Sequence, residues 1–148
     1  MAVAVTTLIV DDSADSRNWL KSKILAIGCQ VVGEAECAAE GWQRFEALHP
    51  RLVTLDIMMP ETDGMTAMDL LSRISREDSD AAVLVVSSRP VRDSHAFLKL
   101  GAIGYLAKPF VRFDEVAELL RACFPELDDE SAALRKKHGL SSRLGYRS

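Results

Sequence analysis

The stretch VTLDIMMPETDG, residues 53–64, places an acidic residue at the end of an apolar run. Val53, Leu55 and Ile57 have the character of a buried strand. Asp56 does not, because a protein core accepts a charge only when that charge is paired. An Asp-Gly pair closes the stretch and is typical of a turn. We therefore predict that a core strand ends at Asp56 and delivers one carboxylate to the edge of a sheet.

Short apolar runs and helical patterns alternate on both sides of this stretch. The predicted strands cover residues 6–10, 30–35, 52–57, 81–87 and 104–107. The predicted helices cover residues 14–27, 38–48, 64–75, 91–100 and 112–124. Repeated strand–helix units favour an α/β fold with a doubly wound, five-stranded parallel sheet. Among the topologies that right-handed crossovers allow, the flavodoxin-like strand order 2-1-3-4-5 is the leading choice.

The composition fits one globular domain. The chain has 148 residues, of which 48% are apolar and 27% charged, so it can bury a core. We place the domain at residues 1–124 and interpret residues 125–148 as a C-terminal tail or linker that can hold a short helix. The three cysteines follow neither disulfide nor zinc-site spacing, and we read no signal peptide and no membrane span. We expect a cytoplasmic protein without a membrane partner.

The net charge of −4 is unevenly distributed. Residues 135–148 contain five of the 18 basic residues and none of the 22 acidic ones. The body of the chain is therefore acidic, which argues against nucleic-acid binding by the domain itself. The basic tail is more often a solvated chain end than a binding surface.

Polar residues stand where the central strands end. In chain order they are Asp11-Asp12, Asp56, Ser87-Ser88 and Lys108-Pro109. Ligands of doubly wound sheets bind at this edge. Two carboxylates ~4 Å apart repel by roughly 4 kcal/mol at an effective dielectric of ~20, so cations must offset them. Lys108 supplies one charge, and the oxygen-only ligand set favours Mg²⁺ (or Mn²⁺) for the rest.

A cation site with a protruding carboxylate, a hydroxyl and a lysine suits phosphoryl transfer. Asp56 can act as the nucleophile and form an acyl phosphate. The metal ion and Lys108 then neutralise charge on the transferring group. Ser87 can donate a hydrogen bond to one phosphoryl oxygen once the group is attached.

Four segments resemble the response-regulator receiver domain of two-component signalling, the CheY-like family, over about residues 5–124. In the family's order and spacing they are LIVDDS (8–13), LDIMMPETDG (55–64), VVSS (85–88) and GAIGYLAKPF (101–110). The resemblance implies that Asp56 is the phosphorylated residue. It also implies that Asp11, Asp12, Asp56 and the backbone carbonyl of Met58 bind the metal ion.

The resemblance extends to the switch and to the partners. It implies that Ser87 and Lys108 bind the phosphoryl group and that Tyr105 moves with Ser87. Loop-shaping roles fall on Pro60, Gly64 and Pro109. A sensor histidine kinase or a histidine phosphotransfer protein would donate the phosphoryl group in a phosphorelay. A downstream protein would bind the face formed by the fourth helix, fifth strand and fifth helix.

Two positions that vary in this family are Met58 and Arg89. We expect both side chains to shield the acyl phosphate from water and to slow self-dephosphorylation. Ile103 and Gly104 stand where many DNA-binding relatives carry acids, which favours the stand-alone type. The chain could also be the receiver portion of a longer regulator, or a receiver-like docking module that is never phosphorylated.

Two other classes fit the residues less well. A phosphohydrolase of the haloacid-dehalogenase kind would need a second acid at position 58. A flavodoxin-like electron carrier would need a phosphate-binding loop where DDSADS is acidic. We therefore expect a phosphoacceptor that assists its own phosphorylation and slow dephosphorylation, and no enzyme in the ordinary sense.

Overall fold

The computed structural model describes residues 4–88, 94–108 and 113–127, and strands and helices alternate throughout this part of the chain. In chain order the elements are β1 (Thr6–Val10), α1 (Ala14–Ala26), β2 (Gln30–Ala35), α2 (Ala38–Leu48), β3 (Leu52–Asp56), α3 (Ala67–Glu77), β4 (Ala82–Ser87), α4 (Ser94–Lys99), β5 (Gly104–Ala107) and α5 (Phe113–Cys123).

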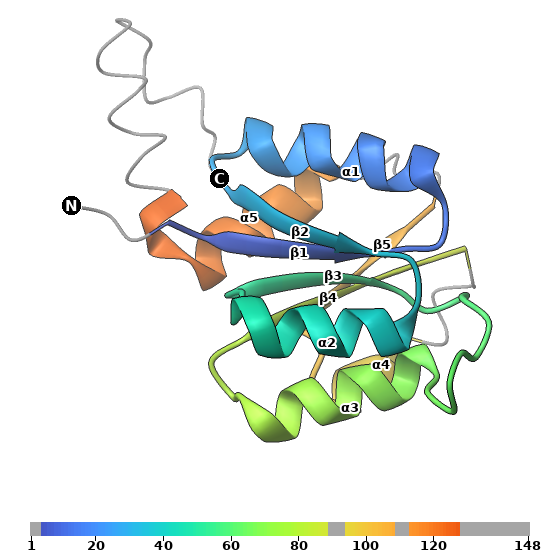
Figure 1. Ribbon diagram of the computed structural model, residues 1–148. Coiled ribbons are helices and arrows are strands. Elements are labelled where there is room, and N and C mark those ends of the chain that lie inside the picture. The colour runs from blue at the N-terminus through green and yellow to red at the C-terminus, as the bar shows by residue number, and fades with distance from the viewer. Residues whose placement is uncertain (1–3, 89–93, 109–112, 128–148) are drawn as a thin grey trace, which may run out of the picture.

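The strands form one parallel sheet in the order β2-β1-β3-β4-β5, which confirms the predicted topology. Helices α1 and α5 cover one face, and α2, α3 and α4 cover the other (Figure 1). The chain leaves β1 toward β2 on one side and enters β3 on the other. The carboxyl ends of β1 and β3 therefore flank the topological switch point, where ligands of such sheets bind.

Alternate residues of the central strands fill two cores, because side chains of a strand point to opposite faces. Val83 and Val85 of β4 pack with α2, α3 and α4, in the core that contains Trp42 and Phe45. Leu84 and Val86 pack toward α1 and α5. Both faces of the sheet are thus buried, which explains why β3 and β4 consist of buried residues throughout.

Helix α3 begins at Ala67, so the prediction that it starts at residue 64 was wrong. The two preceding positions, Asp63 (φ 53°) and Gly64 (φ 77°), have positive φ and cannot belong to a right-handed helix. Thr66 accepts a hydrogen bond from the Asp69 N–H at 3.1 Å, and the Asp69 carboxylate accepts one from the Thr66 N–H at 3.0 Å. This capping box sets the start of the helix.

The ends of other elements shift by a residue from the prediction. Helix α1 stops at Ala26, since Gly28 follows with a φ of 101°. Strand β3 ends at Asp56 and β4 begins at Ala82. Residues 89–93 lie outside the described part, so the predicted start of the fourth helix is not compared.

The packed structure continues beyond α5 to Leu127. Phe124 and Leu127 are buried against the α1/α5 core. The Arg51 guanidinium pairs with Glu126 at 2.6 Å, lies over the Phe124 ring at 5.1 Å, and donates a hydrogen bond to the Ala4 carbonyl at 3.3 Å. The domain boundary at residue 124 stays a prediction.

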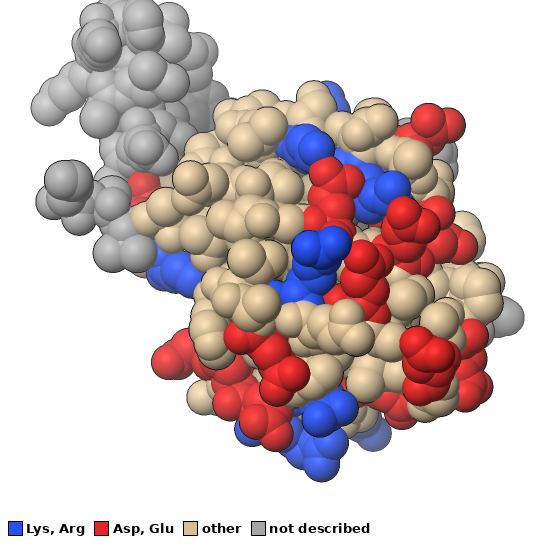
Figure 2. Space-filling model, in the orientation of Figure 1, with Lys and Arg blue, Asp and Glu red and all other residues tan. Residues whose placement is uncertain are grey.

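Charged side chains are distributed unevenly over the surface. Basic and acidic side chains interleave near the exposed sheet edge, and acidic ones gather toward the carboxyl ends of the strands (Figure 2). Within the described ranges, no helix is long and apolar enough to cross a membrane.

Candidate functional site

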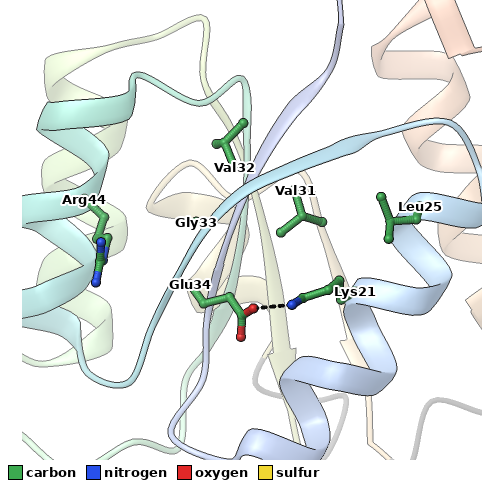
Figure 3. Close-up of a pocket in the computed structure, with 7 residues that line it drawn as sticks. All are labelled: Lys21, Leu25, Val31, Val32, Gly33, Glu34 and Arg44. Carbon is green, nitrogen blue, oxygen red and sulfur yellow. Dashed lines mark ion pairs between the residues drawn. The ribbon is translucent and has the colours of Figure 1, made fainter.

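A pocket of about 440 Å³ lies at the exposed edge of the sheet, over β2 and between α1 and α2 (Figure 3). Lys21, Glu34 and Arg44 line it. Lys21 pairs with Glu34 at 2.5 Å, and Arg44 pairs with Glu40 at 3.1 Å. The charges of this pocket thus neutralise one another, and none of the predicted site residues lines it.

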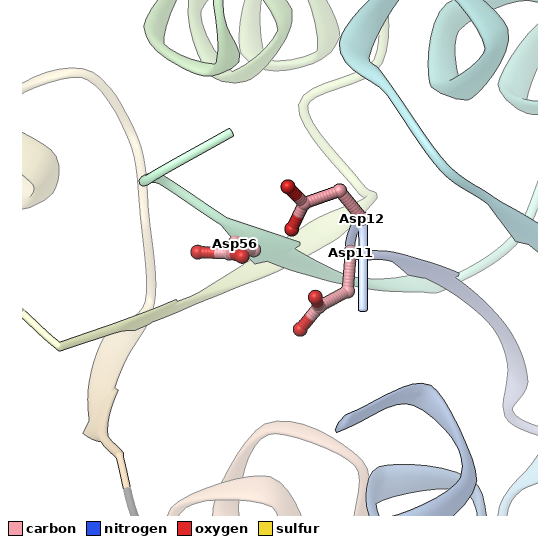
Figure 4. A group of neighbouring side chains, drawn as sticks. All are labelled: Asp11, Asp12 and Asp56. Carbon is pink, nitrogen blue, oxygen red and sulfur yellow. The ribbon is translucent and has the colours of Figure 1, made fainter. Parts of the chain in front are cut away.

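The predicted acids meet instead at the carboxyl ends of β1 and β3. Asp11 and Asp12 follow β1 directly, and Asp56 ends β3. One carboxylate oxygen from each residue lies within 4.8 Å of the others. The three side chains extend to the same side of the strand ends (Figure 4). Asp11 and Asp56 are 0% and 2% exposed, whereas Asp12 is open to solvent.

Backbone N–H groups orient the two buried acids. Asp11 Oδ1 accepts a hydrogen bond from the Ser13 N–H, and Asp56 Oδ1 accepts one from the Met58 N–H, both at 2.9 Å. Ser13 also caps α1, because its Oγ accepts a hydrogen bond from the Ser16 N–H at 3.2 Å. Each buried carboxylate therefore has one oxygen tied to the loop that follows its strand.

Lys108 faces the remaining oxygens of both acids. Its Nζ lies 3.3 Å from Asp56 Oδ2 and 3.4 Å from Asp11 Oδ2. The Lys108 N–H donates to the Ser87 carbonyl at 2.9 Å, which extends the pairing of β4 with β5. Asp11 Oδ2 makes no hydrogen bond of good geometry among the described residues, despite its distance to Lys108.

The electrostatics leave this site short of positive charge. Burial raises the pKa of Asp11 most, and the Asp56 charge raises it further, against the Ser13 N–H and Lys108. Burial lowers the pKa of Lys108, but the carboxylates of Asp56 and Asp11 raise it by more, so its net shift is upward and it stays protonated. Three carboxylates thus face one ammonium group.

The donor set fits a hard divalent cation. The ligand atoms are oxygens only, and the unbonded, buried Asp11 Oδ2 is a polar atom without an adequate partner. Mg²⁺ prefers a few carboxylates and keeps several waters, which the exposed side of Asp12 permits. No described group of the His/Cys type that zinc prefers joins the cluster.

Ser87 and Tyr105 lie on the same face of the sheet. Ser87 is fully buried and ends β4, two positions after Val85, whose side chain points toward α2, α3 and α4. Tyr105 packs against the same core, and its ring stacks on Phe97 of α4 with centroids 6.0 Å apart. This placement is compatible with the predicted coupling of the two residues.

The remaining predicted site residues differ in what the structure describes. Met58 follows Asp56 by two positions, and 48% of its surface is exposed. Pro60 and Gly64 lie in the loop before α3, where Thr62 and Met65 form an isolated bridge. Arg89 and Pro109 fall outside the described residues, so their roles stay predictions.

Arg17 is a neighbour of the acids that sequence reasoning missed. Its Nη1 donates a 2.6 Å hydrogen bond to the Asp11 carbonyl, and its Nε contacts Glu34 Oε1 at 3.0 Å. One signal was available: a cation in the first turn of a helix opposes the helix dipole and requires a compensating partner.

Known proteins match the chain along most of its length. The family model for the response regulator receiver domain matches residues 7–121. The chemotaxis protein CheY of Bacillus subtilis is 36% identical over 114 residues, which cover 76% of this chain and 92% of that protein. A protein-glutamate methylesterase/protein-glutamine glutaminase of Geobacter sulfurreducens is 40% identical over 108 residues, which cover 71% of this chain and 28% of that protein.

Solved structures agree with these matches. The CheX-CheY-BeF3-Mg+2 complex from Borrelia burgdorferi contains a chain with a TM-score of 0.71 and 27% identity. That match covers 80% of this chain and 88% of the other. The response regulator domain of Thermotoga maritima CheB has a TM-score of 0.68 and 29% identity, over 85% of this chain and 98% of that one.

Proposed function

Because the chain belongs to the response regulator receiver domain family, we propose that it is a phosphoacceptor switch in which Asp56 carries the phosphoryl group. One observation carries this proposal: Asp56 stands at the switch point of the sheet with Asp11, Asp12 and Lys108 around it. A carboxylate so placed has a free approach from solvent through the side occupied by Asp12.

The transfer step follows from the chemistry of the carboxylate. A carboxylate oxygen of Asp56 attacks phosphorus, an O–P bond forms, and the P–N bond to the donor's phosphohistidine breaks. The donor imidazole leaves with the electron pair of that bond. A Mg²⁺ ion bound by Asp11, Asp12, Asp56 and the Met58 carbonyl would neutralise charge on the phosphoryl oxygens. Lys108 adds a further positive charge 3.3 Å from Asp56 Oδ2.

The attached phosphoryl group changes what Lys108 and Ser87 contact. Lys108 pairs with the phosphoryl oxygens, and the Ser87 hydroxyl donates to one of them. Movement of Ser87 opens space toward Tyr105 on the same face of the sheet, and the Tyr105 ring then moves relative to Phe97. The modification thereby shifts an equilibrium between two arrangements of the face formed by α4, β5 and α5.

The partners follow from this switch. A sensor histidine kinase or histidine phosphotransfer protein donates, and a downstream protein binds the α4–β5–α5 face, in the cytoplasm. Ordinary enzyme activity is not part of this function. The relatives include a protein of similar length and a much longer methylesterase, so a stand-alone regulator and the receiver portion of a longer one both fit. A docking module that is never phosphorylated is the alternative.

An intact-mass measurement tests the proposal. The protein is incubated with Mg²⁺ and a small phosphodonor, and we expect a gain of one HPO₃ group that EDTA suppresses. Asp56→Asn should remove this gain. Asp63→Asn is the matched control, since Asp63 is exposed in the following loop and its positive φ suits asparagine. An unmodified wild-type protein under these conditions would favour the docking module.

A further inference from the structure

Arg17 connects the metal-site loop to the edge of the sheet. Only 13% of its side chain is exposed, although it carries a charge. Its guanidinium group donates to the Asp11 carbonyl at 2.6 Å and to Glu34 of β2 at 3.0 Å. The transfer chemistry assigns no role to this side chain, so its burial needs another explanation.

The carbonyl that Arg17 contacts belongs to the peptide unit between Asp11 and Asp12. The Asp11 N–H donates to Ala35 at 3.0 Å, and this is where the pairing of β1 with β2 ends. The Asp11 carbonyl therefore receives its hydrogen bond from Arg17 instead of from a neighbouring strand. Because a peptide unit is planar, holding its carbonyl also sets the direction in which the Asp12 backbone continues.

The structure thus assigns Arg17 as a positioning residue for the divalent cation, which acts by holding the Asp11–Asp12 peptide; this inference rests on the proposed function. Asp11 is additionally held by Ser13 and Ala35. Asp12 is exposed, so its carboxylate depends most on the orientation of that peptide.

Geometry, and not charge, is the property that Arg17 contributes. A cation near the site would by itself repel a metal ion. Glu34 neutralises Arg17 at 3.0 Å, and the side-chain charges that shift the pKa of Asp11 are those of Asp56 and Lys108. Holding a carbonyl and a carboxylate at once requires the two-pronged guanidinium group, which a lysine ammonium does not reproduce.

Glu34 and Lys21 provide matched comparisons. Glu34 orients Arg17, and it also pairs with Lys21 at 2.5 Å. The hydrogen bond to the Asp11 carbonyl comes from Arg17. Replacing Lys21 therefore removes a cation from the same cluster without removing the contact to the metal-site loop.

Calorimetric titration with Mg²⁺ alone tests the assignment, and unfolding in EDTA measures the fold separately. We expect Arg17→Met and Arg17→Lys each to weaken Mg²⁺ binding roughly tenfold, as replacing residues that support metal ligands does. Glu34→Gln should cause a smaller loss and none in addition to Arg17→Met. Lys21→Met should stay within about twofold of wild type, since effects near that size are usual for remote surface changes.

Different failures have different meanings. Wild-type affinity in both Arg17 variants, or tighter binding by Arg17→Met with normal binding by Arg17→Lys, would overturn the positioning role and leave the proposed function intact. No Mg²⁺ binding by the wild-type protein would overturn both. If Arg17→Met does not fold, Glu34→Gln decides: unchanged affinity in that variant contradicts the assignment.

Discussion

Replacing Asp11 with asparagine should stabilise the metal-free protein and weaken its binding of divalent cations. In the metal-free state the Asp11 carboxylate is fully buried, and its Oδ2 lacks a good hydrogen bond among the described residues. Asparagine keeps the shape and can still accept the hydrogen bond from the Ser13 N–H. It removes the charge, which is the costly part of this side chain without a metal ion.

The magnitude follows from the distances. Asp11 and Asp56 have oxygens within 4.8 Å, which at an effective dielectric of ~20 corresponds to a repulsion of roughly 3.5 kcal/mol or more. Lys108 at 3.4 Å from Asp11 returns about 5 kcal/mol on the same scale. The two terms nearly cancel, so the burial penalty decides the sign. We expect Asp11→Asn to raise the free energy of unfolding by on the order of 1 kcal/mol at pH 7 in EDTA.

The pH dependence provides a second test of the same reasoning. The pKa of Asp11 is raised above its ordinary value of 3.8, so between those two values the folded state binds more protons than the unfolded state. The contribution of Asp11 to stability is complete below pH 3.8 and is lost as the pH rises through the folded pKa. The advantage of Asp11→Asn should therefore grow from about pH 4 upward until it becomes constant. Glu34 and Glu40, whose pKa values are lowered, act in the opposite direction but equally in both proteins.

Urea unfolding monitored by tryptophan fluorescence measures these differences. Trp19 and Trp42 report on opposite faces of the sheet, so coincident transitions would also confirm two-state unfolding. Saturating Mg²⁺ should stabilise the wild type and reverse the order of the two proteins. A less stable Asp11→Asn in EDTA at pH 7, or a difference that does not change with pH, would refute this account of the site.

Three further changes test other parts of the structure. Gly101→Ala should lower the free energy of unfolding by about 2 kcal/mol or more, because Gly101 has a φ of 112° and an added Cβ would collide with the Ser75 side chain; urea unfolding measures this, and a neutral result would contradict the described turn. Thr66→Ala should cost about 1 kcal/mol in the same assay, since it removes the side-chain half of the capping box of α3, and an unchanged midpoint would rule out a stabilising cap. Met58→Asn should speed loss of the phosphoryl group, as read from intact mass over time, if the half-exposed methionine shields the acyl phosphate; an equal rate would remove Met58 as a determinant.

The order of the strands and the meeting of the acids could be predicted because each depends on patterns that are local in the sequence. An apolar run identifies each strand, and parallel strands place their carboxyl ends at one edge, so Asp11, Asp12, Asp56 and Lys108 were brought together by topology alone. Side-chain detail was not needed for that step.

The parts that escaped prediction depend on backbone conformation or on contacts distant in sequence. The start of α3 is set by positive φ at Asp63 and Gly64, and apolar spacing does not contain that information. Arg17 and Glu34 are 17 positions apart and meet only because β2 pairs with β1. Cys123 was assigned to the apolar face of its helix, yet it is exposed, because that face turns away from the sheet near the end of α5.

The contacts of Arg51 bear on how further polypeptide could communicate with the acids. Arg51 gathers Ala4, Phe124 and Glu126 just before β3, and Asp56 ends that strand five residues later. A strand of this length spans roughly 16 Å, so the segment after Leu127 leaves the domain at the edge opposite the acids. A tag or reporter joined there would stand clear of Asp56. It would sense phosphorylation only through changes transmitted along the sheet and its helices, which makes this end a suitable place for a label that must not disturb the chemistry.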